Sequence, residues 1–422
     1  MIGKKPFTRL LIGLLVIAAL GLWVLRGDDN SQLAAGHLLS TPASSQTSLP
    51  PALELLWKYD TSSYIEKTPL LAGDTLYVIV SSVRRQSSSC RDDHGGWCYQ
   101  LLAFEMATGK LKWTLDDYEY QPTVADGVIY SGWGGELHAI DTATHQVKWK
   151  YKTAKVTNNA PFVTGDVKYA PAVADGVVYF GSGETLYALY ADTGLEKWRV
   201  KYTDEIASSP VVFGGFVYVV GHYVRMSQYS DVMSYQANMY AVRKDNGQQL
   251  WKFEPEAGFG QPGAVRNPVV ADDGTVYCTS IPTGVNEPGY VLAFDGKTGG
   301  QLWKHLPGTG QNYYPYPVVV QDGTLYFEVD DDGLYAMDTG TGQPQWTFDL
   351  RNIGPHALTI VQGVLYVTTT EGTVYGIDAK SGKEAARYLL GENYYSEIVA
   401  TDRDVYFVGR HPNGIYAFVL PK

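Results

Sequence analysis

Residues 173–198 read VADGVVYFGSGETLYALYADTGLEKW, and this stretch decides the fold. Two of its segments, residues 177–180 and 186–189, are rich in β-branched and aromatic residues, which favour strands. The dipeptide Asp175-Gly176 before the first segment is typical of a tight hairpin turn. A sheet this small cannot bury both of its faces alone, so the unit has to pack against copies of itself.

The unit recurs along the chain with fixed offsets. A small residue in the second aromatic segment marks each copy, at Ala103, Ala139, Ala188, Ala241, Ala293, Ala336, Gly376 and Ala417. Six residues after the first seven markers stands a turn residue, which is glycine in all copies except the second, where it is His145. Ten residues after the first six markers comes a tryptophan: Trp113, Trp149, Trp198, Trp251, Trp303 and Trp346. Eight copies with one spacing predict eight equivalent sheets.

The last two copies are incomplete. The seventh has Ala386 in the tryptophan position, and the eighth reaches Lys422 before a tryptophan strand could form. Residues 55–59, LLWKY, have the composition of the other tryptophan strands. A strand from the N-terminus would complete the last sheet and remove both open edges of a ring. The sequence therefore predicts an all-β, eight-bladed β-propeller of four-stranded antiparallel blades, in which Trp57 joins the six tryptophans above as a residue that packs between blades.

The pattern Ala-x-Asp-x-x-Thr-Gly-x-x-x-Trp, clearest at 336–346 and 293–303, resembles the pyrroloquinoline-quinone (PQQ)-like repeat. The resemblance covers about residues 53–422 and implies membership of the quinoprotein alcohol dehydrogenase-like superfamily, which includes BamB-like propellers. BamB-type lipoproteins carry a cysteine just after the N-terminal apolar run, and this chain has none there. Since propellers host many unrelated activities, the repeat specifies the fold more strongly than the function.

The N-terminus has the pattern of a membrane anchor. Lys4, Lys5 and Arg9 precede an apolar run that ends at Leu25 and is followed by Arg26. We expect a short cytoplasmic segment at 1–9, a transmembrane or signal-anchor helix at 10–26 and a flexible linker at 27–52, with a cleaved secretory signal as the alternative. The propeller at 53–422 would then lie on the extracytoplasmic side, in the periplasm or at the cell surface. The net charge of −11 and the lack of a basic run beyond the N-terminus argue against a nucleic-acid partner.

Length variation points to one face of the propeller. With blade strands lettered A to D from the centre outward, the A–B and C–D turns are short, and the variation falls on B–C insertions (81–99, 222–237, 280–289) and D–A connections (150–170, 253–267, 305–316). Insertions confined to one face indicate a binding face. Tyrosines suit peptide or glycan surfaces because they offer flat apolar area with a polar tip. The candidate ligand-binding residues lie in the blade 4 insertion and in the segments that enter blades 2, 6 and 8: Tyr118, Tyr120, Tyr223, Arg225, Tyr229, Tyr235, Tyr313, Tyr314, Tyr316, Tyr394 and Tyr395.

The three cysteines suggest one disulfide. Cys90 and Cys98 lie in one insertion, and in an oxidising compartment we expect them to form a disulfide, with two free surface thiols as the alternative. Cys278 lies within a predicted strand and is expected to be buried and inert. No residue set has the spacing of a catalytic or metal site; Asp330-Asp331-Asp332 lacks the further oxygen ligands of a calcium loop.

Three functions remain open at this level. The favoured one is a non-catalytic, monomeric, membrane-anchored propeller that binds an envelope protein or polysaccharide and has no cofactor. The second is a PQQ-dependent quinoprotein dehydrogenase with Ca²⁺; such enzymes typically carry adjacent cysteines beside the quinone, and this chain has no Cys-Cys pair. The third is a ligand-sensing ectodomain.

Overall fold

The structure is a computed structural model of the 422-residue chain. It describes residues 54–65, 67–83, 97–133, 135–153, 166–226, 233–255, 264–265, 268–281, 289–307, 315–329, 332–350, 355–369, 372–389, 395–410 and 413–420. The chain divides into two units, Met1–Thr47 and Ser48–Lys422, and every described residue belongs to the second. The predicted segments 1–9, 10–26 and 27–52 lie outside the described residues. Within the described ranges, no helix has the length and apolarity needed to cross a membrane.

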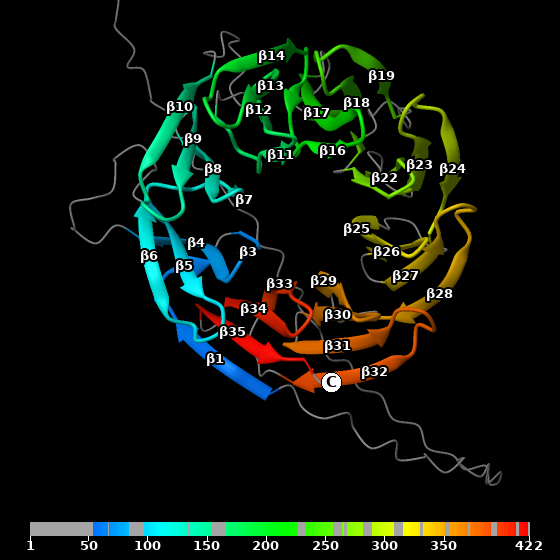
Figure 1. The fold of residues 1–422 in the computed structure, drawn as a ribbon. Helices are drawn as coiled ribbons and strands as arrows, with labels where there is room; N and C mark the ends of the chain where they lie inside the picture. The colour runs from blue at the N-terminus through cyan, green and yellow to red at the C-terminus, as the bar shows by residue number, and fades with distance from the viewer. Residues whose placement is uncertain are drawn as a thin grey trace, which may run out of the picture. The chain divides into compact units, whose positions relative to one another are not determined.

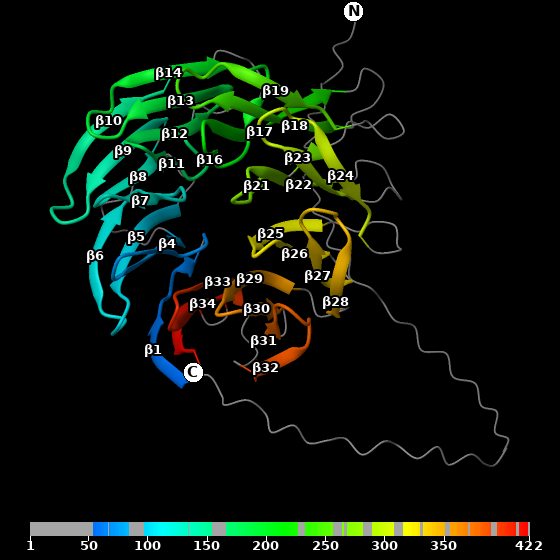
Figure 2. The same ribbon diagram turned by 45° about the vertical axis from the view of Figure 1, so that its right-hand side comes forward.

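Eight antiparallel sheets follow one another around a ring, as the sequence predicts (Figures 1 and 2). Blade 1 comprises β2 (Tyr64–Ile65), β3 (Leu70–Ala72), β4 (Thr75–Val83), β5 (Trp97–Glu105) and β6 (Leu111–Asp116), and blade 2 comprises β7 (Thr123–Ala125), β8 (Val128–Trp133), β9 (Glu136–Asp141) and β10 (Val147–Lys152). Blade 3 comprises β11 (Ala172–Ala174), β12 (Val177–Ser182), β13 (Thr185–Tyr190) and β14 (Glu196–Lys201). Blade 4 comprises β15 (Glu205–Ile206), β16 (Val211–Phe213), β17 (Phe216–Met226), β18 (Met233–Arg243) and β19 (Gln249–Phe253).

The second half of the ring repeats the arrangement. Blade 5 comprises β20 (Ala264–Val265), β21 (Val269–Val270), β22 (Thr275–Ile281), β23 (Val291–Asp295) and β24 (Gln301–His305), and blade 6 comprises β25 (Pro315–Gln321), β26 (Thr324–Val329), β27 (Gly333–Asp338) and β28 (Pro344–Asp349). Blade 7 comprises β29 (Pro355–Val361), β30 (Val364–Thr369), β31 (Thr373–Asp378) and β32 (Glu384–Leu389). Blade 8 comprises β33 (Tyr395–Ala400), β34 (Asp404–Arg410), β35 (Asn413–Val419) and β1 (Glu54–Asp60). In blades 1, 4 and 5 the innermost strand is split into two short pieces, which the repeat pattern does not reveal.

The ring closes through the N-terminal strand. β1 pairs antiparallel with β35, and the register places Trp57 opposite Ala417, as Trp198 lies opposite Ala188 within blade 3. In Figure 1 the blue strand β1 accordingly lies beside the red strand β35. The predicted closure is confirmed, and the eighth sheet is assembled from both ends of the propeller sequence.

Burial follows each strand's position in its blade. The B and C strands of blade 3, β12 and β13, are buried at almost every position because neighbouring blades cover both of their faces. The outer strand β6 alternates between half-buried and exposed residues, because only one of its faces meets the next blade. The core is therefore a series of seams between sheets, and each seam must be sealed by side chains of successive blades.

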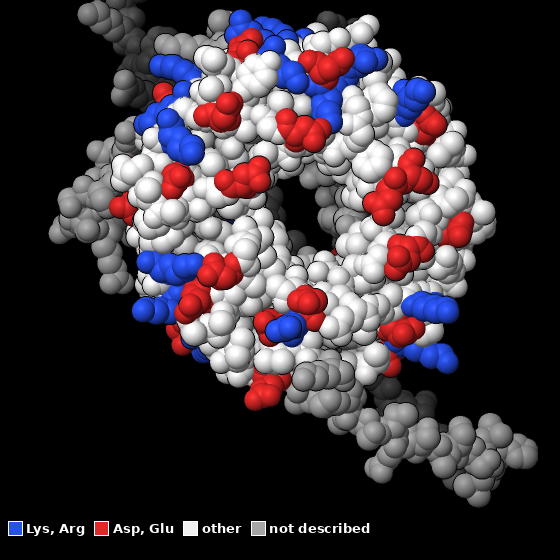
Figure 3. All heavy atoms as spheres, viewed as in Figure 1, with Lys and Arg blue, Asp and Glu red and all other residues white. Residues whose placement is uncertain are grey.

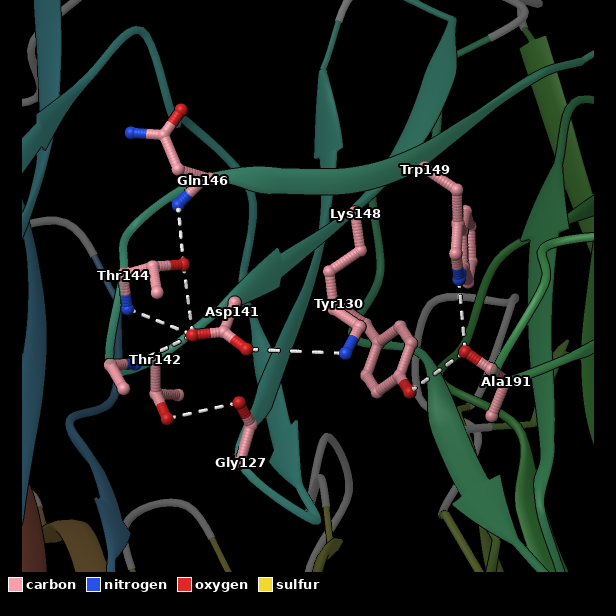
Figure 4. A network of polar contacts seen from close by, with 10 residues as sticks. Gly127, Tyr130, Asp141, Thr142, Thr144, Gln146, Lys148, Trp149 and Ala191 are labelled. Atoms are coloured by element: carbon pink, nitrogen blue, oxygen red, sulfur yellow. Dashed lines mark hydrogen bonds and ion pairs between the residues drawn. The ribbon is translucent and has the colours of Figure 1, made fainter.

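Seven tryptophans lie at seven of the eight seams. In six of them the indole N–H donates to a backbone carbonyl of the next blade at 2.7–3.0 Å: Trp57 to Met106, Trp149 to Ala191, Trp198 to Lys244, Trp251 to Gly296, Trp303 to Thr339 and Trp346 to Ala379. Each indole also lies on the turn glycine three residues after that carbonyl. A Cβ atom added to any of these glycines would come within 2.4–2.7 Å of the ring. The spacing of tryptophan and glycine in the sequence is thus a contact between neighbouring blades. Figure 4 shows one case, in which Trp149 and Tyr130 both donate to the Ala191 carbonyl.

The seam between blades 7 and 8 is sealed differently. Among the described strands, blade 8 takes its outer strand β1 from the N-terminal side, so β35 and β1 are not joined by a C–D turn that could offer a glycine to an indole. Ala386 occupies the tryptophan position and is buried in a cluster with Tyr388, Ile398 and Leu420. The missing tryptophan is therefore a consequence of the way the ring closes, because its docking partner is missing as well.

Candidate functional site: the insertion face

The two faces of the ring are distinguished by backbone hydrogen bonds between their loops. On one face, A–B turns bond to the residues that begin the C–D turns, as in Thr142 N to Gly127 O at 2.9 Å. We call this the turn face. On the other, B–C turns bond to D–A connections, as in Tyr202 N to Glu184 O at 2.8 Å and Thr153 N to Gly135 O at 3.0 Å. We call this the insertion face, because the insertions predicted from the sequence belong to its B–C and D–A connections.

The blade 4 insertion is a long β-hairpin. Strands β17 and β18 are each 11 residues long, and they stay paired from Phe216↔Arg243 to Met226↔Met233 without a register shift. The predicted B–C insertion 222–237 therefore extends the two central strands of the blade beyond the neighbouring sheets. Tyr223, Arg225 and Tyr235 lie on this extension, where Tyr223 pairs with Gln236 and Val224 with Tyr235.

Close backbone packing fixes the D–A connections that lead to this hairpin. An added Cβ atom on Gly132 would come within 2.1 Å of the Val167 carbonyl oxygen, and one on Gly181 within 2.3 Å of the Ile206 side chain. On Gly221, at the base of the hairpin, it would come within 2.9 Å of Asp204. Glycines on the B strands thus let the D–A connections of blades 3 and 4 lie directly against the sheets.

A buried polar cluster holds the base of the hairpin. Asp204 is 2% exposed, and its Oδ2 accepts hydrogen bonds from Asn238 Nδ2 at 2.7 Å and from the Tyr240 hydroxyl at 2.6 Å. Burial, followed by the hydrogen bond to Asp204, raises the pKa of Tyr240. Burying a carboxylate costs free energy unless its oxygens accept hydrogen bonds. The two bonds offset this cost, and they also attach the D–A connection before blade 4 to β18.

Beside this cluster lies an ion pair. Lys168 Nζ is 2.9 Å from Glu205 Oε1, and His222 Nε2 is 3.7 Å from Glu205 Oε2. Glu205 is 7% exposed, and the backbone register also places it opposite His222. Lys168 precedes blade 3, Glu205 begins blade 4 and His222 lies on β17, so the contacts join two blades to the hairpin. These ionic contacts and the backbone pairing hold the base of the β17–β18 hairpin in place, and we call it the braced hairpin.

The described candidate tyrosines have different environments. Tyr118 is 8% exposed, and its hydroxyl lies 3.2 Å from His138 Nδ1, so most of its ring is covered by protein. Burial, followed by the charge of Asp117, raises the pKa of Tyr118 to about 12. Tyr120 is half-buried, and burial followed by the charge of Asp166 raises its pKa. Tyr120 is therefore a candidate whose side chain keeps some exposed surface on the insertion face.

The other candidates are placed only in part. Tyr316 and Tyr395 lie on the strands β25 and β33. Tyr229, Tyr313, Tyr314 and Tyr394 lie outside the described residues, so the prediction that they contact a ligand stays a prediction. The structure adds Lys168, Asp204, Glu205, His222 and Asn238, which the sequence analysis missed. No fixed repeat offset connects these five residues, because they meet only through the packing of successive D–A connections.

The cysteines differ in state. Cys98 is buried and disulfide-bonded. Its predicted partner Cys90 lies outside the described residues, so the pairing itself stays a prediction. Cys278 is a free thiol that is 1% exposed, and burial raises its pKa.

The polar cluster does not fit a calcium-bound quinone. Asp204 and Glu205 offer the hard oxygen ligands that Ca²⁺ prefers. However, Asp204 Oδ2 already accepts two hydrogen bonds, and the Lys168 ammonium lies against Glu205, where it would repel a cation. Among the described residues, no group of three or more histidines, cysteines or acids is arranged to hold a metal ion.

Comparisons with known proteins agree with the fold. The profile of the family described as outer membrane protein assembly factor BamB matches residues 53–220 and 235–409. The solved structure of BamB from Moraxella catarrhalis superposes with a TM-score of 0.59 over 87% of this chain and 100% of its own, at 14% identity. A quinohemoprotein alcohol dehydrogenase from Pseudomonas putida HK5 superposes with a TM-score of 0.58 over 87% and 76% of the two chains, also at 14% identity.

A curated relative matches over a shorter stretch. The serine/threonine-protein kinase AfsK of Streptomyces griseus is 30% identical over 152 residues, which is 34% of this chain. The match spans only 18% of the kinase's own length. At these identities the solved structures establish the propeller fold and leave the activity open.

Proposed function

Because the chain belongs to the family of the outer membrane protein assembly factor BamB, we propose that it is a non-catalytic binding module of the cell envelope that holds a partner protein on its insertion face. In this proposal residues 10–26 anchor the chain in a membrane, residues 27–52 form a tether, and the propeller at 53–422 lies on the extracytoplasmic side. The protein acts as a single propeller and uses no cofactor of its own.

The braced hairpin β17–β18 is the observation that carries the proposal. A binding element loses less conformational entropy on association when it is already ordered. Here continuous pairing along β17 and β18 supplies that order, and Asp204 and Glu205 fix the base of the hairpin. The turn face, by contrast, is built from short turns of one repeated design.

Site-specific crosslinking tests which face meets the partner. A photoreactive amino acid replaces Tyr235 on the hairpin or Gln362 in a turn of the opposite face, in the full-length chain in its own membrane. We expect a protein adduct from position 235 and none from position 362. Adducts from position 362 alone would assign the partner to the turn face.

A second measurement tests the non-catalytic part of the proposal. The full-length protein is titrated with PQQ and Ca²⁺, with dye reduction by alcohol substrates as the readout. We expect neither saturable quinone absorbance nor dye reduction. Turnover in this assay would make the protein a quinoprotein dehydrogenase.

A further inference from the structure

One tryptophan seam departs from the other six. Between blades 1 and 2 the turn glycine is replaced by His145, which has a φ of 59°. Its imidazole lies over the indole of Trp113, with ring centroids 4.6 Å apart. The angle between the planes of Trp113 and Tyr77 is 59°, whereas the matching tyrosine–tryptophan pairs at the other six seams have angles of 41–47°.

Among the described residues, this seam also lacks a hydrogen-bond clamp that four other seams have. At four of the other seams the tryptophan and a tyrosine both donate to one carbonyl of the next blade, as Trp149 and Tyr130 do to Ala191 in Figure 4. The equivalent carbonyl at this seam belongs to Thr142. Within the described part of the chain, neither Trp113 nor Tyr77 donates to it, so blades 1 and 2 are not clamped together on the turn face.

A cavity of about 650 Å³ opens at this seam. Its aromatic wall is formed by Trp113 and Tyr77, and its charged lining consists of Asp74, Asp126 and Lys112. Lys112 Nζ donates to Asp74 Oδ1 at 2.9 Å and to Thr75 Oγ1 at 2.8 Å. Asp126 is exposed and has no ion pair within the described residues. One carboxylate charge thus remains uncompensated in the cavity lining. Figure 3 shows one face of the ring, with acidic side chains distributed around its central opening.

The seam between blades 3 and 4 shows what can fill such a space. There Lys244 begins the C–D turn at the position that Thr142 has in blade 2, since the backbone N–H of each bonds to the A–B turn of its own blade. The Lys244 ammonium reaches across the seam to Asp175 in the A–B turn of blade 3, at 2.5 Å. Asp74 lies in the corresponding turn of blade 1, one position further along the chain. Thr142 is too short to reach it, so residue 142 does not fill the space that the Lys244 side chain fills in the other seam.

We propose that the cavity between blades 1 and 2 is a binding site for an alkylammonium ligand, whose charge pairs with Asp126 and whose carbon chain lies along the aromatic wall of Trp113 and Tyr77. The aromatic wall favours this chemistry, since a cation near an indole face is attracted by its quadrupole. A lysine side chain of a bound peptide and a free diamine share the chemistry. The site is on the turn face and is independent of the partner proposed for the insertion face.

Calorimetric titration of the full-length protein tests the site. The probes are 1,5-diaminopentane, N-acetyl-lysine amide and, as a neutral isostere, 1,5-pentanediol. We expect saturable binding of at least one amine, at one ligand per chain, and at least about tenfold weaker binding of the diol. The more strongly bound amine identifies the source of the ligand: preference for the diamine assigns a free diamine, and preference for the lysine derivative assigns a peptide side chain.

Three variants localise the binding. Asp126→Asn keeps a residue that tolerates positive φ but removes the charge, and it should weaken amine binding about tenfold or more. Thr142→Lys supplies the missing side chain from the protein itself and should abolish binding without lowering the melting temperature. Asp322→Asn changes the same type of turn in blade 6 and should leave binding unchanged. Equal binding of the diol, or full binding by the folded Thr142→Lys protein, would overturn the proposal.

Discussion

The indole of Trp57, on the first described strand, donates a hydrogen bond of 2.7 Å to the backbone carbonyl of Met106 in blade 1. Trp57 belongs to the sheet of blade 8, because β1 pairs with the C-terminal strand β35. This one contact therefore joins the last blade to the first. It gives the N-terminal strand two roles, completion of a sheet and closure of the ring.

Removing this side chain should destabilise the whole propeller. Trp57 is 8% exposed, and replacing a buried tryptophan by alanine costs about 3–5 kcal/mol of unfolding free energy. We expect Trp57→Ala to lower the melting temperature sharply and deletion of residues 1–60 to cause aggregation through the open edge of β35. Deletion of residues 1–47 is the control and should leave the melting temperature unchanged. A 1–60 deletion as stable as that control would rule out closure by β1.

The seam without a tryptophan should not accept one. Ala386 is 6% exposed, and its Cβ would lie only 3.0 Å from a Cβ atom added to Gly376. Ala386→Trp introduces an indole with no turn glycine to receive it, and such overpacking costs about 1–3 kcal/mol. Denaturant unfolding of the variant measures the loss. A gain in stability would mean that the seam has room for an indole after all.

His145 and Gly194 occupy equivalent turn positions and should respond in opposite ways to substitution. His145→Gly relieves a positive φ of 59° and restores the surface on which Trp113 can lie, so we expect a gain of about 1 kcal/mol. Gly194→Ala places a Cβ atom 2.6 Å from Trp149 at a φ of 71°, so we expect a clear loss. Unfolding free energies of the two variants provide the comparison. Destabilisation by both would show that the imidazole of His145 seals its seam as well as a glycine does.

The repeated turns should make stability depend on acid pH. Hydrogen bonds from Thr341 lower the pKa of Asp338, and those from Ser381 lower the pKa of Asp378. A carboxylate with a lowered folded-state pKa stabilises the fold fully above its unfolded value of about 4, and the contribution is lost as the pH falls through the folded value. We expect the melting temperature to fall below about pH 4, and Asp338→Asn to reduce that fall because asparagine accepts hydrogen bonds without titrating. An equal fall in the variant would exclude Asp338 as a contributor.

The repeat made most of the fold predictable because its offsets are contacts. The ten-residue spacing between the small marker residue and the tryptophan places Trp198 opposite Ala188 in the sheet. The indole then lies on the turn glycine of the next blade. The unpaired Trp57 and the early end of the eighth copy then predicted the closure. The reason why Ala386 replaces a tryptophan was harder to predict, because it depends on blade 8, whose described strands include no C–D turn.

The candidate site was harder to predict because it lies outside the repeat. The 222–237 insertion is visible as added length, but its pairing as a hairpin depends on register. Asp204, Glu205 and Lys168 come from different connections and have no shared spacing. Tyr118 fits the aromatic pattern of a binding loop, yet the structure buries it against His138. Composition alone cannot distinguish a tyrosine that covers the core from one that meets a partner.

Shortening the braced hairpin tests the central claim most directly. Replacing residues 224–235 by Asn-Gly leaves the pair Tyr223↔Gln236 next to a two-residue turn and keeps Asp204, Glu205 and His222. The measurement is the yield of partner crosslinked to the full-length chain from a photoreactive residue at Tyr120, with Asp322→Asn as a turn-face control of equal stability. We predict at least a tenfold loss of adduct in the shortened protein, at an unchanged melting temperature, and no loss in the control. An undiminished adduct in the folded, shortened protein would contradict binding through the insertion-face hairpin.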